Sequence, residues 1–282
     1  MCSRFLKVLL FCGCLTVEGL EEQQPLPPSR LLLRVAADPN NLPFSNDKLE
    51  GYENKLASLI ARDFEMELQY VWRAQRRGFF RETLKNGQAD LVLSVPAGFE
   101  MALTTRPYYR SSYVFVYPRS HSAIISTFDD PYLRRARIGV QLTGDDGVNP
   151  PPAHAFAQRG IITNLVGYTL YGDYREANPP ARIIDGLDRG EIDLAVVWGP
   201  LAGYFAQRAA IPMQLTPVIP SSEPPLRYAF NISMAVPKRA SALQARLNDL
   251  IQRRHAEIEA LLDEFAIPRL PLEPDQDRTE KD

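Results

Sequence analysis

Polar and aromatic side chains stand just beyond several short apolar runs of the sequence, where a folded chain could hold a ligand. In open α/β sheets, ligands bind beyond the carboxyl ends of the strands. Residues of these types bind a ligand through hydrogen bonds, aromatic stacking or one positive charge, rather than by forming a covalent bond with it. The predicted ligand-binding residues are Asp38, Asn40, Phe44, Arg76, Ser94, Tyr108, Thr143 and Trp198.

Each of these candidates has a plainer structural alternative. Asn40 lies in an Asn-Asn-Leu-Pro stretch that favours a turn for backbone reasons alone. Arg76 precedes a predicted helix and is typical either of an anion site at the helix start or of a solvated surface side chain. Tyr108 either stacks on a ligand or packs in the core. Trp198 precedes Gly-Pro at a strand end, which favours the cleft over the core.

The residues that support catalysis are scarce. The three histidines are scattered, and neither G-x-S-x-G nor H-E-x-x-H occurs. Asp145-Asp146-Gly147 contains calcium-binding residue types, but adjacent aspartates do not make a spaced ligand loop, so a solvated turn is favoured. We therefore predict no catalytic residues, no metal site and no cofactor.

The N-terminus indicates export. Arg4 and Lys7 precede an apolar run of signal-peptide length, and Val17-Glu18-Gly19 offers a cleavage site, which predicts a signal peptide over residues 1–19. A buried N-terminal strand and a lipoprotein site at Cys14 are weaker alternatives. All three cysteines lie in this segment, so the exported chain would have no disulfide or thiol nucleophile.

The remaining composition excludes other classes of protein. The net charge is −2, whereas nucleic-acid binding usually requires a basic domain. No later stretch is long and apolar enough for a membrane helix. The last residues, 271–282, are polar and are predicted to be a disordered tail.

Strand and helix patterns alternate along the first half, which favours a parallel, buried sheet. Leu56, Leu59, Ile60 and Phe64 lie on one face of a predicted helix. A second helical pattern ends at Gly87. The predicted strands are LLLRVAA (31–37), LQYVW (68–72) and ADLVLSV (89–95).

The second half repeats part of the first. L-x-x-G-x-x-D-L occurs from Leu84 and again from Leu187, an offset of 103 residues. The same offset relates Arg34-Val35-Ala36 to Arg137-Ile138-Gly139. Chance similarity is an alternative, because helix–Gly–strand junctions are common. The repeat favours two lobes of one design.

Two further strand patterns are predicted to connect the lobes. Residues 113–117 and 231–236 are each followed by a proline and a basic residue. The helical pattern at 241–266 would then return to the first lobe. We predict an α/β, two-lobed periplasmic binding protein fold of type II, with a central cleft and a two-strand hinge. Lobe 1 would comprise residues 30–117 and 230–270, and lobe 2 residues 118–229.

These features together resemble the periplasmic solute-binding proteins of family 3, over about residues 30–265. The matching stretches include GYENKLASLIARDF and GEIDLAVVWG. DPNNLPFSN, QRRGFFRETL, VPAGFEMALTTRPYYRSSYVFVY and VQLTGDDGVNPPPAHAFAQRGI resemble one branch more specifically. That branch is the MoxJ/XoxJ type, associated with quinoprotein dehydrogenases.

The chain departs from the amino-acid binders of this family at two anchors. Those proteins carry an arginine for the ligand carboxylate where this chain has SVPAGFE, with no basic residue between Ser94 and Arg106. Where they carry an acid for the amino group, this chain has Trp198. An amino-acid ligand would then bury unpaired charges, at a cost on the order of several kcal/mol.

The resemblance implies a non-enzymatic periplasmic protein that serves a PQQ-dependent methanol or alcohol dehydrogenase. Its cleft would hold a segment of the dehydrogenase or a maturation-related small-molecule or peptide ligand. The alternative is a receptor that delivers a small non-amino-acid solute to an ABC transporter. An enzyme is a third hypothesis, because some relatives of the fold are dehydratases, but no clear acid–base pair supports it.

Overall fold

The computed structural model describes residues 31–143, 149–171 and 174–274. The predicted signal peptide, the Asp145-Asp146-Gly147 turn and the tail from residue 275 lie outside the described residues. Within those described ranges, no helix combines the length and the apolar character needed to cross a bilayer.

Strands and helices alternate as predicted, with many short connections. The strands are β1 (Leu32–Ala37), β2 (Asn40–Asn41), β3 (Ser45–Asn46), β4 (Glu67–Trp72), β5 (Val92–Pro96), β6 (Leu103–Thr104), β7 (Tyr109–Pro118), β8 (Ile138–Gln141), β9 (Leu165–Tyr168), β10 (Leu194–Trp198), β11 (Met213–Pro217), β12 (Ser222–Glu223), β13 (Leu226–Arg227) and β14 (Ala229–Val236). The α-helices are α1 (Tyr52–Asp63), α2 (Pro151–Gln158), α3 (Arg182–Asp188), α4 (Gly199–Ala206), α5 (Ser241–Arg253) and α6 (His255–Glu264). Short helical turns occupy Arg81–Lys85, Pro131–Arg134 and Pro179–Ala181.

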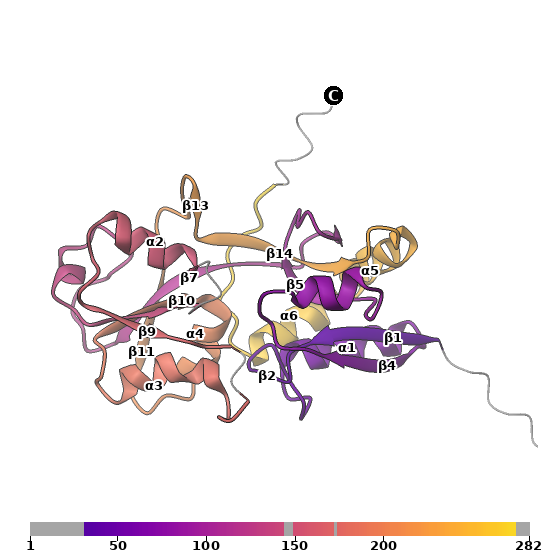
Figure 1. The fold of residues 1–282 in the computed structure, drawn as a ribbon, viewed down its shortest axis with the longest axis horizontal. Coiled ribbons are helices and arrows are strands. Elements are labelled where there is room, and N and C mark those ends of the chain that lie inside the picture. Colours follow the sequence, from indigo (N-terminus) through magenta and orange to yellow (C-terminus); the bar gives the residue numbers. More distant parts are fainter. Residues whose placement is uncertain (1–30, 144–148, 172–173, 275–282) are drawn as a thin grey trace, which may run out of the picture. The chain divides into compact units, whose positions relative to one another are not determined.

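The strands form two lobes joined by β7 and β14 (Figure 1). In lobe 1, β4 pairs with β1 in parallel, a bridge joins Val35 of β1 to Leu91, and β5 and β6 pair with β14. In lobe 2, β9, β8 and β10 are parallel, and β7 lies between β10 and β11. The predicted α/β, two-lobed fold is confirmed.

The two connecting strands pair with each other as well as with the lobes. Tyr109–Ser112 of β7 pair antiparallel with Ala229–Ile232 of β14. From Tyr113 onward, β7 pairs with β10 and β11. The first crossing therefore lies near Ser112, earlier than the predicted hinge segment 113–117 and the lobe boundary at residue 117.

Helix α1 forms where the apolar spacing predicts it. Leu56 and Ile60 are fully buried, and Leu59 and Phe64 are nearly so. The side-chain Oδ1 of Asn54 accepts the backbone N–H of Gly51 at 3.0 Å, which satisfies a donor at the helix start. This packing fixes the first turn of α1 against the loop that carries β2 and β3.

The repeat at an offset of 103 residues corresponds to matching structure. The Arg34 guanidinium lies 2.6 Å from the Asp90 carboxylate, and Arg137 lies 2.6 Å from Asp193. Each aspartate also accepts the backbone N–H of its arginine. Gly87 and Gly190, the glycines of the repeat, have φ of 69° and 67°, which favours glycine in both turns. The two lobes thus share one helix–turn–strand design.

The C-terminal part returns to lobe 1 and then continues along the connecting strands. Arg253 and Arg254 bind Asp63 of α1, at the junction of α5 and α6. Beyond α6, the backbone of Leu270 bonds to Arg110 of β7. Glu273 pairs with Arg110, and its backbone exchanges two hydrogen bonds with the side chain of Asn231. Residues 271–274, predicted to belong to a disordered tail, therefore pack against β7 and β14.

Candidate ligand-binding site

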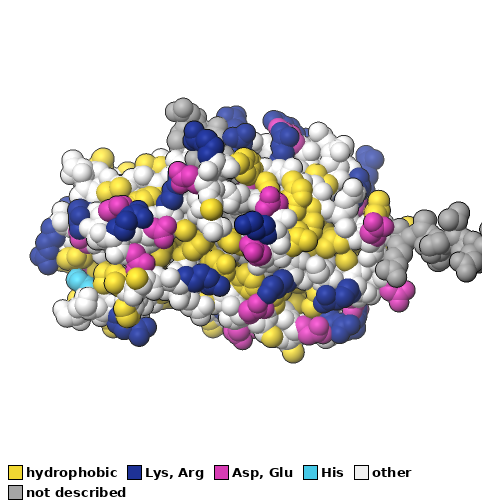
Figure 2. Space-filling model, turned by 90° about the horizontal axis from the view of Figure 1, so that it is seen from below, with side chains coloured by type: hydrophobic (Ala, Val, Ile, Leu, Met, Phe, Trp, Pro, Cys, Tyr) yellow, Lys and Arg dark blue, Asp and Glu magenta, His cyan; other side chains and the backbone are white. Residues whose placement is uncertain are grey.

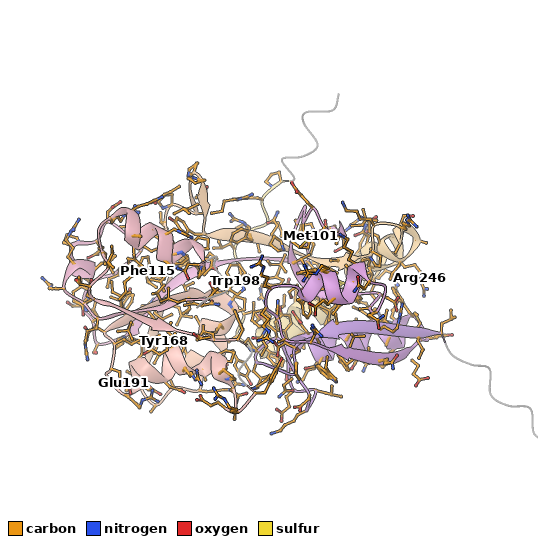
Figure 3. The ribbon with its side chains drawn as sticks, in the orientation of Figure 1. Met101, Phe115, Tyr168, Glu191, Trp198 and Arg246 are labelled. Carbon is orange, nitrogen blue, oxygen red and sulfur yellow. The ribbon has the colours of Figure 1, made fainter. Side chains whose placement is uncertain are left out.

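A cavity of about 280 Å³ lies among the strand ends and connecting strands of the two lobes. Ligand cavities usually start at roughly 300 Å³, so this one suits a small molecule or a single side chain. Figure 3 marks Trp198 at the end of β10, where lobe 2 meets lobe 1. The described lining residues are Asn41, Phe44, Gln75, Ser94, Val95, Pro96, Tyr109, Tyr113, Gln141, Tyr171, Trp198, Phe230 and Ile232.

None of these thirteen lining residues carries a formal charge. The lining combines amides, hydroxyls and aromatic rings. Figure 2 shows charged side chains of both signs spread over the face seen from below, around exposed hydrophobic side chains. Because an unpaired charge is costly to bury, such a lining favours an uncharged occupant.

Aromatic rings from both connecting strands form one wall. The ring centroid of Trp198 lies 5.4 Å from that of Tyr113 on β7 and 5.9 Å from that of Phe230 on β14. Both contacts are edge-to-face, a favoured aromatic geometry. All three side chains are only partly buried, so they can contact a ligand as well as one another.

Two side-chain amides contribute polar groups to the lining. Asn41 donates from Nδ2 to Oε1 of Gln75 at 2.9 Å. Asn41 is 1% exposed, and its Oδ1 has no hydrogen-bond partner within the described part of the chain. A buried acceptor without a partner costs about 1–3 kcal/mol, and a ligand donor would recover this energy.

Hydroxyl groups form the floor of the cavity. Ser94 Oγ shares hydrogen bonds with Tyr52 Oη at 2.7 Å and with Tyr108 Oη at 3.1 Å. Tyr52 Oη also lies 3.1 Å from Tyr109 Oη, and Tyr108 donates to the Leu93 carbonyl. This network ties the end of β5 to α1 and to the start of β7.

Two acidic residues lie behind this floor, outside the lining. Burial raises the pKa of Glu53 to about 7, while a hydrogen bond from Ser94 opposes the rise and the charge of Asp38 adds to it. Burial also raises the pKa of Asp38. The hydrogen bonds that its carboxylate accepts from the backbone N–H groups of Gln75 and Asn40 act in the opposite direction and lower that pKa. Both carboxyl groups are held by the protein rather than presented to a ligand.

Three predicted ligand-binding residues line the cavity: Phe44, Ser94 and Trp198. Two others lie behind it. Asp38 is 1% exposed and fixes the loop from β1 to β2, and Tyr108 is buried in lobe 1. Of the two interpretations of Tyr108, stacking on a ligand or packing in the core, its position fits packing in the core.

The remaining predicted residues lie at the edges. Asn40 donates to the carbonyl of Glu176 at 2.7 Å and accepts the N–H of Asn178, so it bridges the two lobes. Arg76 is exposed and electrostatically close to Asp38 and Tyr174. Thr143 bonds to Asn149 near the end of β8.

The predicted anion site beside Arg76 is not supported by its surroundings. The helical turn that follows is only five residues long, Arg81–Lys85. Its Glu82 pairs with Arg73 and lies 3.7 Å from Arg81. A carboxylate therefore already occupies the neighbourhood in which an anion would bind.

Sequence reasoning missed the contribution of the two connecting strands. Tyr109 and Tyr113 of β7, and Phe230 and Ile232 of β14, line the cavity. Tyr109 and Tyr113 are four residues apart, and Phe230 and Ile232 are two apart, so each pair lies on one face of its strand. That spacing was readable in the sequence, but it could not show which face meets the cleft. Gln141 and Tyr171 complete the lining from lobe 2.

The described residues offer no ready metal centre. No group of three or more His, Cys, Asp or Glu side chains in the described ranges is placed to hold a metal ion. The arrangement of amides, hydroxyls and rings can position a molecule by hydrogen bonds and stacking.

Comparison with known proteins gives the same overall design. The family model of the bacterial extracellular solute-binding proteins, family 3, matches residues 33–266. Protein MoxJ of Methylorubrum extorquens is 25% identical over 253 residues, which cover 87% of this chain and 84% of MoxJ.

Two solved structures resemble this chain along most of its length. MxaJ from Methlophaga aminisulfidivorans MPT has a TM-score of 0.74 and 25% identity, with 84% of this chain and 100% of MxaJ covered. The periplasmic binding protein XoxJ from Methylobacterium extorquens AM1 has a TM-score of 0.70 and 33% identity, with 85% of this chain and 100% of XoxJ covered.

Proposed function

Because the chain belongs to family 3 of the bacterial extracellular solute-binding proteins and is of the MoxJ/XoxJ type, we propose that it serves a PQQ-dependent methanol or alcohol dehydrogenase. It acts in the periplasm as a non-enzymatic binding protein. Its cleft holds a segment of the dehydrogenase or a ligand needed during maturation of that enzyme.

The observation that carries this proposal is the absence of formal charge from the described cavity lining. An amino-acid receptor needs a cation for the carboxylate and an anion for the ammonium group. Here Ser94-Val95-Pro96 and Trp198 stand at the two anchor positions. Closing such a cavity on a zwitterion would desolvate both charges without pairing them, which costs on the order of several kcal/mol.

A second function has one specific observation in its favour. A cavity of about 280 Å³ with polar and aromatic walls also suits a small uncharged solute. The chain would then deliver that solute to an ABC transporter. Genes for a permease and an ATPase beside the gene for this chain would favour this role, whereas genes for a dehydrogenase and a c-type cytochrome would favour the first.

Capture of the dehydrogenase tests the first role directly. The purified chain is immobilised and exposed to a purified PQQ-dependent alcohol dehydrogenase of the same organism. We expect the native chain to retain the enzyme and Trp198→Ala to bind at least about tenfold more weakly, because aromatic anchors dominate such interfaces.

The matched control uses the second of the two tryptophans. Trp72 lies at the end of β4, outside the cavity lining, and stacks on Tyr70. Trp72→Ala should retain the dehydrogenase as the native chain does. No capture by the native chain, or unchanged dehydrogenase activity and assembly after deletion of its gene, would reject the accessory role.

A further inference from the structure

We infer that the cavity binds an uncharged amide bearing an aromatic ring, with an N–H of the ligand donating to Asn41 Oδ1 and the ring lying against Trp198 and Phe230. This inference deepens the proposed function and rests on it, because it names the chemistry of the segment that the cleft would hold. A polypeptide supplies such groups as its backbone amides and aromatic side chains.

The requirement for a hydrogen-bond donor comes from Asn41. Its side chain is held in place by the bond from Nδ2 to Gln75, and it is almost fully buried. Its Oδ1 nevertheless has no partner among the described residues. Because buried acceptors are normally paired, an unpaired acceptor on a residue that lines the cavity points to a donor on the occupant.

The requirement for neutrality comes from the lining as a whole. The described lining residues provide no charge to pair with an ion. The nearby carboxylate of Asp38 is already engaged by the backbone N–H groups of Asn40 and Gln75. A quaternary ammonium ion could contact the aromatic faces, but it has no N–H and would leave Asn41 Oδ1 unpaired.

The requirement for a ring comes from the aromatic side chains of the lining. Trp198, Tyr113 and Phe230 meet edge to face and remain partly exposed. Such a wall accepts another ring in an offset or edge-on position. Ser94 and Gln141 also line the cavity and carry a hydroxyl and an amide group.

The test uses the fluorescence of Trp198 alone. Trp72→Phe leaves Trp198 as the single tryptophan of the chain. This variant is titrated with N-acetyl-L-phenylalaninamide, with free L-phenylalanine and with tetramethylammonium chloride. The first two probes share a side chain and differ in charge. The reciprocal variant, Trp198→Phe, reports from Trp72 outside the cavity and should show no saturable change.

We expect saturable binding of the capped amide and at least tenfold weaker binding of free phenylalanine, with no response to tetramethylammonium. Equal or tighter binding of free phenylalanine, a saturable response to tetramethylammonium, or no saturable response to the capped amide would overturn the inference.

A variant and a modified probe test the role of Asn41. Asn41→Leu should weaken binding of the capped amide about tenfold, the usual effect of losing one buried hydrogen bond. Asn86→Leu, at an exposed position outside the cavity, is the matched control. The capped amide with its acetamide nitrogen methylated and its terminal amide dimethylated lacks N–H donors and should bind the Trp72→Phe protein equally weakly. Undiminished binding of that probe would overturn the assignment even if Asn41→Leu does not fold.

The outcome can be separated from that of the proposed function. Capture of the dehydrogenase without binding of the capped amide would reject this inference alone. Binding of the capped amide without capture of the dehydrogenase would reject the accessory role and leave the chemistry of the cavity in place.

Discussion

Ser94 Oγ lies 2.7 Å from Tyr52 Oη, so the serine at the cavity floor is hydrogen-bonded to the core of lobe 1. Tyr108 bonds the same hydroxyl from a second direction. Ser94, predicted from the sequence to bind a ligand, thus also stabilises lobe 1, and its replacement affects stability as well as binding.

Ser94→Ala should lower the free energy of unfolding by about 1–2 kcal/mol, because it removes the hydrogen bonds to Tyr52 and Tyr108 while both tyrosines keep another partner. Urea unfolding followed by circular dichroism measures the change. Ser120→Ala, at an exposed position, is the control and should be neutral. Equal stability of the two variants would show that the network contributes little.

Glu53 should make stability depend on pH. Burial raises its pKa from an ordinary value of 4.5 to about 7, so between these values the folded chain binds one more proton than the unfolded chain. Its contribution to stability is therefore greatest below about pH 4.5 and is lost as the pH rises through 7. The decrease is on the order of 2–3 kcal/mol.

Glu53→Gln isolates this effect because it keeps the size of the side chain and cannot ionise. The difference in unfolding free energy between the native chain and this variant, measured by urea titration from pH 4 to pH 8, should shift in favour of the variant as the pH rises. Parallel pH profiles would mean that Glu53 ionises normally in the folded chain.

The C-terminal segment should stabilise the connecting strands. Glu273 pairs with the nearly buried Arg110 and bonds Asn231 of β14 through its backbone. Ending the chain after Leu270 should lower the free energy of unfolding by about 2–3 kcal/mol, since Arg110 loses its carboxylate partner.

A second truncation provides the control for this prediction. Ending the chain after Pro274 keeps all of those contacts and should leave the midpoint of urea unfolding unchanged. If both truncations unfold at the same urea concentration, the contacts of Glu273 do not restrain the connecting strands.

Much of the fold could be predicted because apolar periodicity and local repeats are strong signals. Leu56 and Ile60 indicate the buried face of α1, and the repeat indicates that Asp90 and Asp193 occupy equivalent positions, where the structure pairs each with an arginine. These features depend on residues close in sequence or on one face of an element.

The site was harder to predict because neighbouring residues of an extended chain face opposite ways. The sequence does not separate Asn40 from Asn41, Arg76 from Gln75, or Tyr108 from Tyr109, and in each pair the structure places the second residue in the cavity lining. Only the packing of lobe 1 decides which of two neighbours turns inward.

The lining contributed by β7 and β14 depends on where the chain crosses between the lobes. Phe230 and Tyr113 belong to different strands and meet around Trp198 of a third. No local pattern connects residues so far apart in sequence. The crossing itself was predicted, but its position near Ser112 followed only from the pairing of the strands.

The described lining of this cavity lacks the charged anchors of an amino-acid receptor. The most direct measurement is the thermal unfolding of the native chain with each of the twenty common amino acids at millimolar concentration, because a ligand of the native state raises the unfolding temperature. The absence of charge from the described lining predicts no significant rise with any of them. A clear, concentration-dependent rise with one of these zwitterions would contradict the claim.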